Sequence, residues 1–70
     1  MAVIHAEYFS STGLKLQEGF YVSRDTARRH GKKLLGCNKI IINVSDINGD
    51  KQYVYEYNTV INKFWRLSNE

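Results

Sequence analysis

The chain has 70 residues, 43% of them hydrophobic, and a formal net charge of +3. This length suits one domain, residues 1–70, and the apolar content is too high for a disordered segment. The single cysteine, Cys37, excludes an internal disulfide, and no apolar run approaches the roughly 20 residues that span a membrane. Because small secreted domains usually carry several cysteines, the composition predicts a reducing, cytoplasmic location.

Two strands are predicted at the start of the chain. Residues 2–10 alternate loosely, with apolar groups on both sides, which is typical of a strand inside a sheet. The small residues 10–13 then predict a turn. Residues 14–22 resume the alternation, but Glu18 and Gly19 interrupt it, and we expect a β-bulge or a break there. The two strands are expected to form a hairpin.

The segment from Ser23 to Gly36 is the only one with a helical period. Ser23 is suited to cap its N-terminus, and Gly36 is suited to end it in a left-handed conformation. At 100° per residue, a narrow face of small residues includes Ala27 and Gly31, and the opposite face is basic. Gly31 costs about 1 kcal/mol relative to alanine in mid-helix. We interpret it as a sign that the helix lies close to the sheet.

Three more strands are predicted after the helix. Residues 39–44 are almost all β-branched and give the strongest strand signal in the chain. Asn48-Gly49 predicts a tight hairpin into the next strand, residues 51–57, and residues 63–67 form a short last strand. The predicted fold is α+β in the order ββαβββ: a four- or five-stranded antiparallel sheet with one helix packed on one face.

One helix leaves one face of the sheet without cover. A helix of about 13 residues is roughly 20 Å long and covers a single face of a small sheet. Tyr53, Tyr55 and Tyr57 alternate with Val54, and we expect these rings to lie outside the helix-covered core. We interpret them as half-exposed strand residues, as anchors for a partner or a second copy, or as stacking surfaces for bases.

A basic row runs along the predicted helix. It holds half of the Lys and Arg residues in the chain, namely Arg24, Arg28, Arg29, Lys32 and Lys33. Such a row is often only a solvated helix face. Its functional alternatives are contact with nucleic-acid phosphates, which releases counterions, and contact with an acidic protein surface. No helix-turn-helix, zinc site or basic zipper accompanies the row, so base-specific recognition is not expected.

No pattern in the sequence predicts catalysis, a metal site or a cofactor. His5 and His30 lie on different predicted elements, and the sequence pairs neither with a Ser or Cys nucleophile. The segment from Asp46 to Asp50 is similar to the start of a calcium loop, but Lys51 stands where that loop requires glycine. There is no glycine-rich phosphate loop. We therefore predict a protein that is not an enzyme and needs neither cofactor nor metal.

Several local features occur in an order found in certain small phage proteins. They are the segment Gln17–Ser23, Ala27 within the helix, Asn48-Gly49, and Trp65 near the end. This order resembles that of anti-CRISPR proteins that bind the type I-F surveillance complex, in which a hairpin precedes one helix and a meander ending in tryptophan follows. The resemblance implies a phage- or mobile-element-encoded cytoplasmic inhibitor that docks on a host nucleic-acid machine. It assigns no individual functional residue.

The residues and the resemblance together favour a small non-catalytic binding protein. The expected partner is a host protein or nucleoprotein complex, contacted through the basic row and through Tyr53, Tyr55 and Tyr57. Direct, non-specific nucleic-acid binding is one alternative. A homodimer formed through the tyrosine-bearing face is another, and no membrane partner is expected.

Overall fold

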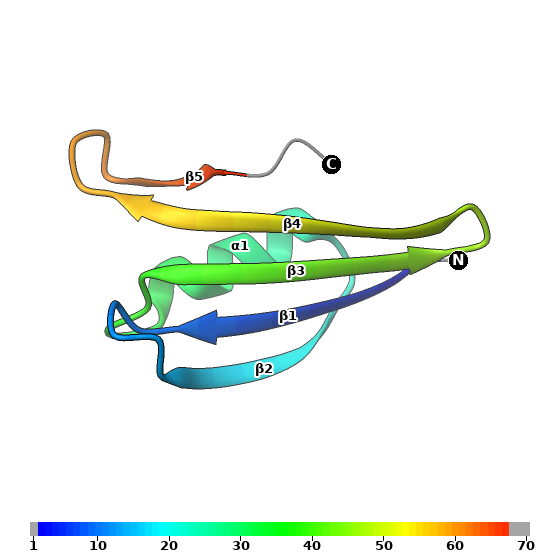
Figure 1. Ribbon diagram of the computed structural model, residues 1–70, viewed down its shortest axis with the longest axis horizontal. Coiled ribbons are helices and arrows are strands. Elements are labelled where there is room, and N and C mark those ends of the chain that lie inside the picture. The colour runs from blue at the N-terminus through cyan, green and yellow to red at the C-terminus, as the bar shows by residue number, and fades with distance from the viewer. Residues whose placement is uncertain (1, 68–70) are drawn as a thin grey trace.

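Five strands and one helix follow one another in the order ββαβββ (Figure 1). The computed structural model describes residues 2–67. The strands are β1 (Val3–Phe9), β2 (Lys15–Tyr21), β3 (Lys39–Asp46), β4 (Gly49–Asn58) and β5 (Lys63–Arg66), and the helix is α1 (Arg24–Lys33). They form one antiparallel sheet in the order β2-β1-β3-β4-β5, with α1 on one face. The α+β prediction is confirmed, and the sheet has five strands.

The bulge in the first hairpin lies earlier in β2 than predicted. The register shifts at Leu16, between the pairs Phe9–Lys15 and Tyr8–Gln17. Gly19 was the predicted break, yet it keeps its pair with Ala6. A Cβ atom at Gly19 would stand 3.6 Å from the Tyr21 hydroxyl oxygen. That distance is ordinary van der Waals contact, so the Tyr21 side chain does not require a glycine at this position, and the ladder continues unbroken through it.

The helix begins as predicted and ends earlier. Ser23 has extended backbone angles, and its Oγ accepts a hydrogen bond from the Thr26 N–H at 3.1 Å, which satisfies one of the unpaired donors of the first turn. The helix ends at Lys33 after 10 residues, roughly 15 Å. Leu34 is already extended and packs against the core, whereas Gly36 adopts its positive φ of 81° in the turn that follows. Burial of Leu34 thus shortens the expected helix.

The core lies between α1 and the central strands. It comprises Ile4, Ala6, Tyr8, Ala27, Ile40, Ile42, Tyr53, Tyr55 and Phe64. Gly31 is buried with them, and a Cβ atom there would stand 3.0 Å from both Ile40 Cγ1 and Tyr8 Cε2. The Tyr8 hydroxyl donates a hydrogen bond of 2.7 Å to the Ala27 carbonyl oxygen, which ties β1 to the helix. The close approach inferred from Gly31 is confirmed.

The tyrosines of β4 lie on the helix-covered face, and the prediction that they lie outside the core was wrong. Tyr53 pairs with Ile42 and Tyr55 with Ile40 across the β3–β4 ladder, and their exposed fractions are 9% and 7%. Tyr57 is half-buried, with its ring edge-on to a core ring. Because α1 contributes only small buried residues to the core, the sheet supplies the large rings that fill it. Tyr53 and Tyr55 therefore belong to the core beneath the helix and do not form an exposed surface.

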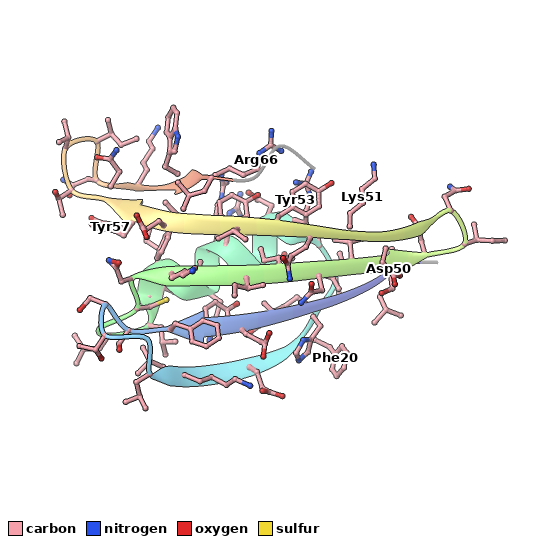
Figure 2. All side chains as sticks on the ribbon, viewed as in Figure 1. Phe20, Asp50, Lys51, Tyr53, Tyr57 and Arg66 are labelled. Atoms are coloured by element: carbon pink, nitrogen blue, oxygen red, sulfur yellow. The ribbon has the colours of Figure 1, made fainter. Side chains whose placement is uncertain are left out.

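The open face of the sheet carries charged and half-exposed apolar side chains. Lys15 forms ion pairs with Glu7, at 2.9 Å, and with Glu18. The His5 imidazole lies 3.6 Å from the Glu18 carboxylate, and its ring centre is 4.9 Å from that of Phe20. Figure 2 shows Phe20 on β2, at one edge of the sheet, and Arg66 on β5, at the opposite edge. This face is thus held by local pairs of side chains without a covering layer.

Candidate functional site

An open groove lies between α1 and β5. It consists of two adjoining hollows, of about 370 and 280 Å³, which share Arg28 and Phe64. Tyr55 and Phe64, both nearly buried, line it from below. We call it the α1–β5 groove. Its cations are Arg24, Arg28, Arg29, Lys32, Lys63 and Arg66.

The helical repeat places one wall of the groove. Residues four apart lie on the same side of a helix, so Arg24, Arg28 and Lys32 form a line along α1. The other wall is β5, a short edge strand that pairs with the end of β4 through Arg66–Tyr55 and Phe64–Tyr57. Alternation along β5 turns Phe64 toward the core. The groove therefore exists only in the folded chain.

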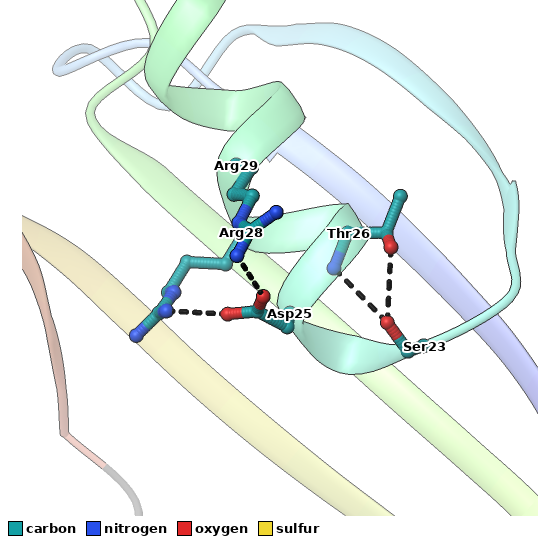
Figure 3. Close-up of polar contacts among 5 residues, drawn as sticks. All are labelled: Ser23, Asp25, Thr26, Arg28 and Arg29. Atoms are coloured by element: carbon teal, nitrogen blue, oxygen red, sulfur yellow. Dashed lines mark hydrogen bonds and ion pairs between the residues drawn. The ribbon is translucent and has the colours of Figure 1, made fainter.

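The groove carries a strong positive charge, because its lining includes one carboxylate against six cations. That carboxylate, Asp25, lies 2.6 Å from Arg28 Nη2 and 2.9 Å from Arg29 Nη2 (Figure 3). Exposed pairs of this kind contribute about 0.3–0.5 kcal/mol each, so they orient the two guanidinium groups more than they stabilise the fold. Within residues 2–67, four of the groove cations form no ion pair: Arg24, Lys32, Lys63 and Arg66.

An aromatic ring holds the guanidinium groups at one end of the groove. The Arg24 guanidinium carbon lies 4.0 Å from the centre of the Tyr53 ring, and that of Arg66 lies 5.8 Å from the same centre. Figure 2 shows Arg66 close to Tyr53. Cations over the face of an aromatic ring are attracted to its quadrupole. Tyr53 therefore positions two cations of the groove from beneath.

The structure brings together most of the predicted site residues. Four members of the basic row line the groove, whereas Lys33 does not. Tyr55 lies at its floor, and the Tyr57 hydroxyl donates to Asn62 Oδ1, 2.9 Å away. Sequence analysis missed Lys63 and Arg66. The only signal for them is their position on either side of Phe64 and Trp65, and it does not reveal that β5 faces the helix.

The remaining chemically reactive side chains have structural partners. His30 lies at the boundary of helix and sheet, with Nε2 2.9 Å from Gln17 Nε2 and its ring against Tyr8 and Tyr21. Burial raises the pKa of the Cys37 thiol, which donates weakly to a backbone carbonyl 3.6 Å away. Among residues 2–67, no three His, Cys, Asp or Glu side chains gather in a way that could hold a metal ion. The same residues contain no helix that is long and apolar enough to span a membrane.

No protein family, characterised protein or solved structure matches this chain. The groove's combination of unpaired cations, an aromatic floor and an exposed Trp65 at the rim defines what a ligand would meet.

Proposed function

We propose that the chain is a small non-catalytic binding protein that docks on an anionic surface of a host nucleic-acid-processing complex. The observation that carries this proposal is the α1–β5 groove, where six of the ten Lys and Arg residues gather around a single carboxylate. The resemblance to anti-CRISPR proteins implies that this docking inhibits the complex.

The arrangement of charges favours binding to an anionic partner. Cations without an acidic neighbour raise the local positive potential, which accelerates encounter with a negative surface and orients it. Four of the six groove cations are arginines, whose planar forks bind carboxylates and phosphates through two hydrogen bonds. Trp65 is 58% exposed and adds an aromatic contact of the type enriched among residues that dominate binding energy.

The proposal is tested with two double variants of equal charge change. Lys32→Glu with Lys63→Glu reverses one cation on each wall of the groove, whereas Lys33→Glu with Lys51→Glu reverses one on α1 and one on the sheet outside it. All four lysines are exposed and form no ion pair within residues 2–67. We therefore expect both variants to keep the thermal midpoint of the wild type within a few degrees.

The readout is the amount of a nucleic-acid-processing complex that a tagged copy retains from native host cells, measured by quantitative mass spectrometry. We expect the groove variant to retain at least tenfold less of the complex than wild type, and the control variant to retain nearly as much. Equal retention by both variants, or equal loss in both, would show that the groove is not the docking site.

A further inference from the structure

The length of the groove indicates how many charges its ligand carries. Arg24 and Lys32 are eight residues apart on α1, which corresponds to roughly 12 Å along the helix axis. Cations line this distance on both sides, with Lys63 and Arg66 on the β5 wall. A strand stacked with the rise of B-form DNA carries one charge per roughly 3.4 Å of its axis, so about four consecutive phosphates of such a strand match this length. A ligand with a single anionic group would engage only a fraction of the groove.

The aromatic residues indicate a ligand whose flat rings are accessible. Phe64 turns toward the core, and alternation along β5 therefore turns the Trp65 side chain to the open face, at the edge of the sheet that borders the same hollow. A strand that leaves the groove over the edge of the sheet meets this exposed indole. Bases stack on aromatic side chains with little dependence on sequence, but in a duplex they already stack on one another. Trp65 thus favours a single strand over a duplex.

We propose that the α1–β5 groove binds about four nucleotides of single-stranded nucleic acid, with phosphates on the groove cations and a base on Trp65. The inference rests on the proposed docking function and specifies which component of the complex the groove contacts. Acidic protein segments share the negative charge of this ligand, but they do not offer a row of flat rings to the indole. Duplex phosphates and acidic peptides are therefore the alternatives that an experiment has to separate.

Trp65 provides the measurement, because it is the only tryptophan in the chain. Its fluorescence is recorded while the wild-type protein is titrated with a 12-nucleotide oligothymidine, a 12-base-pair duplex, or a 12-residue polyglutamate. We expect oligothymidine to quench the fluorescence and to bind at least tenfold more tightly than the other two. The logarithm of its association constant should fall with the logarithm of salt concentration with a slope of about −3, as four phosphates of a single strand require.

The variants separate charge from stacking. Lys32→Glu with Lys63→Glu should weaken oligothymidine binding at least tenfold and flatten the salt slope, whereas Lys33→Glu with Lys51→Glu should keep the slope close to that of wild type. Trp65→Ala, followed by fluorescence anisotropy of a labelled oligothymidine, should weaken binding at least fivefold with the salt slope unchanged. If Trp65→Ala reduced both the affinity and the salt dependence of binding, the indole would not act by stacking on a base.

The outcomes distinguish this inference from the proposed function. Equal affinity for polyglutamate and oligothymidine without quenching overturns the single-strand inference and leaves docking on an acidic surface in place. Tighter binding of the duplex also overturns it. No binding to any of the three polyanions, together with host-complex retention that does not depend on the groove lysines, overturns both.

Discussion

The two faces of the sheet are built from the same strands but are held together differently. On the helix-covered face, Tyr8 and Ile40 are fully buried, and Gly31 brings the helix backbone onto them. On the open face, Ile41 remains half-exposed and Lys15 joins two carboxylates in water. Where the helix side chains are small, α1 packs closely; where they are long cations, a groove remains beside it. The difference shows that packing and charge are assigned to different faces of one helix.

The largest expected effect is on stability, at Ile40 and Ile41, two neighbouring residues that point to opposite faces of the sheet. Ile40→Ala should lower the free energy of unfolding by about 3 kcal/mol, because it leaves a cavity beneath the helix. Ile41→Ala, the matched control on the open face, should cost about 1 kcal/mol. Urea denaturation of both variants measures the difference, and equal losses would contradict the described burial of the two faces.

A smaller effect is expected where the helix touches the sheet. Gly31→Ala gains about 1 kcal/mol of helix propensity but forces a methyl group against Ile40 and Tyr8, and such overpacking costs about 1–3 kcal/mol. We expect a net loss of about 1 kcal/mol in urea denaturation. Lys33→Ala, at an exposed position of the same helix, should change stability by less than about 0.5 kcal/mol. If Gly31→Ala stabilised the protein, close packing would not be the reason for the glycine.

The smallest effect concerns the ion pairs of the open face. The Lys15 ammonium holds the pKa of Glu18 below its usual 4.5, and the two carboxylates raise the pKa of Lys15 to about 12. The contribution of Glu18 to stability is therefore complete above pH 4.5 and is lost as the pH falls through its lowered pKa. Lys15 itself stays protonated throughout the acid range, so the pH dependence of the pair comes from the carboxylate.

Substitution of Lys15 should make this dependence visible. The urea midpoint of Lys15→Met, followed from pH 6 to pH 2, should fall less steeply with acid than that of wild type. Lys51→Met removes an exposed lysine without an ion pair within residues 2–67, and it should follow the wild-type curve. Parallel curves for all three proteins would show that the Lys15 pairs do not contribute.

Local chemistry was sufficient to predict the order of the elements. The hydroxyl of Ser23 before a polar helical segment, the β-branched run of β3 and the Asn48-Gly49 pair each act over a few residues. The structure contains the cap and the strand, and a tight turn one residue earlier than predicted, with Gly49 opening β4 at a φ of 122°. The end of the helix was predicted too late, since the burial of Leu34 depends on the sheet. Elements set by neighbours in the sequence were therefore predictable, and those set by packing were not.

The faces of β4 and the groove depend on contacts between distant residues. Alternation shows that Tyr53 and Val54 point to opposite sides, but it does not show which side the helix covers. The small side chains of Ala27 and Gly31 determine which side of β4 faces the helix, because large rings are needed to fill the core opposite them. Lys63 joins the groove only because β5 lies at the edge of the sheet nearest the basic flank of α1. No spacing within the sequence contains that information.

The contact between Gly31 and Ile40 has a consequence for how this chain can diverge. The helix and β3 share one small volume at that point, and neither residue can grow unless the other shrinks. Descendants of this sequence that acquire alanine at position 31 should acquire valine or alanine at position 40. Such paired replacements in divergent copies would show from sequence alone that the helix and β3 are in close contact at this point.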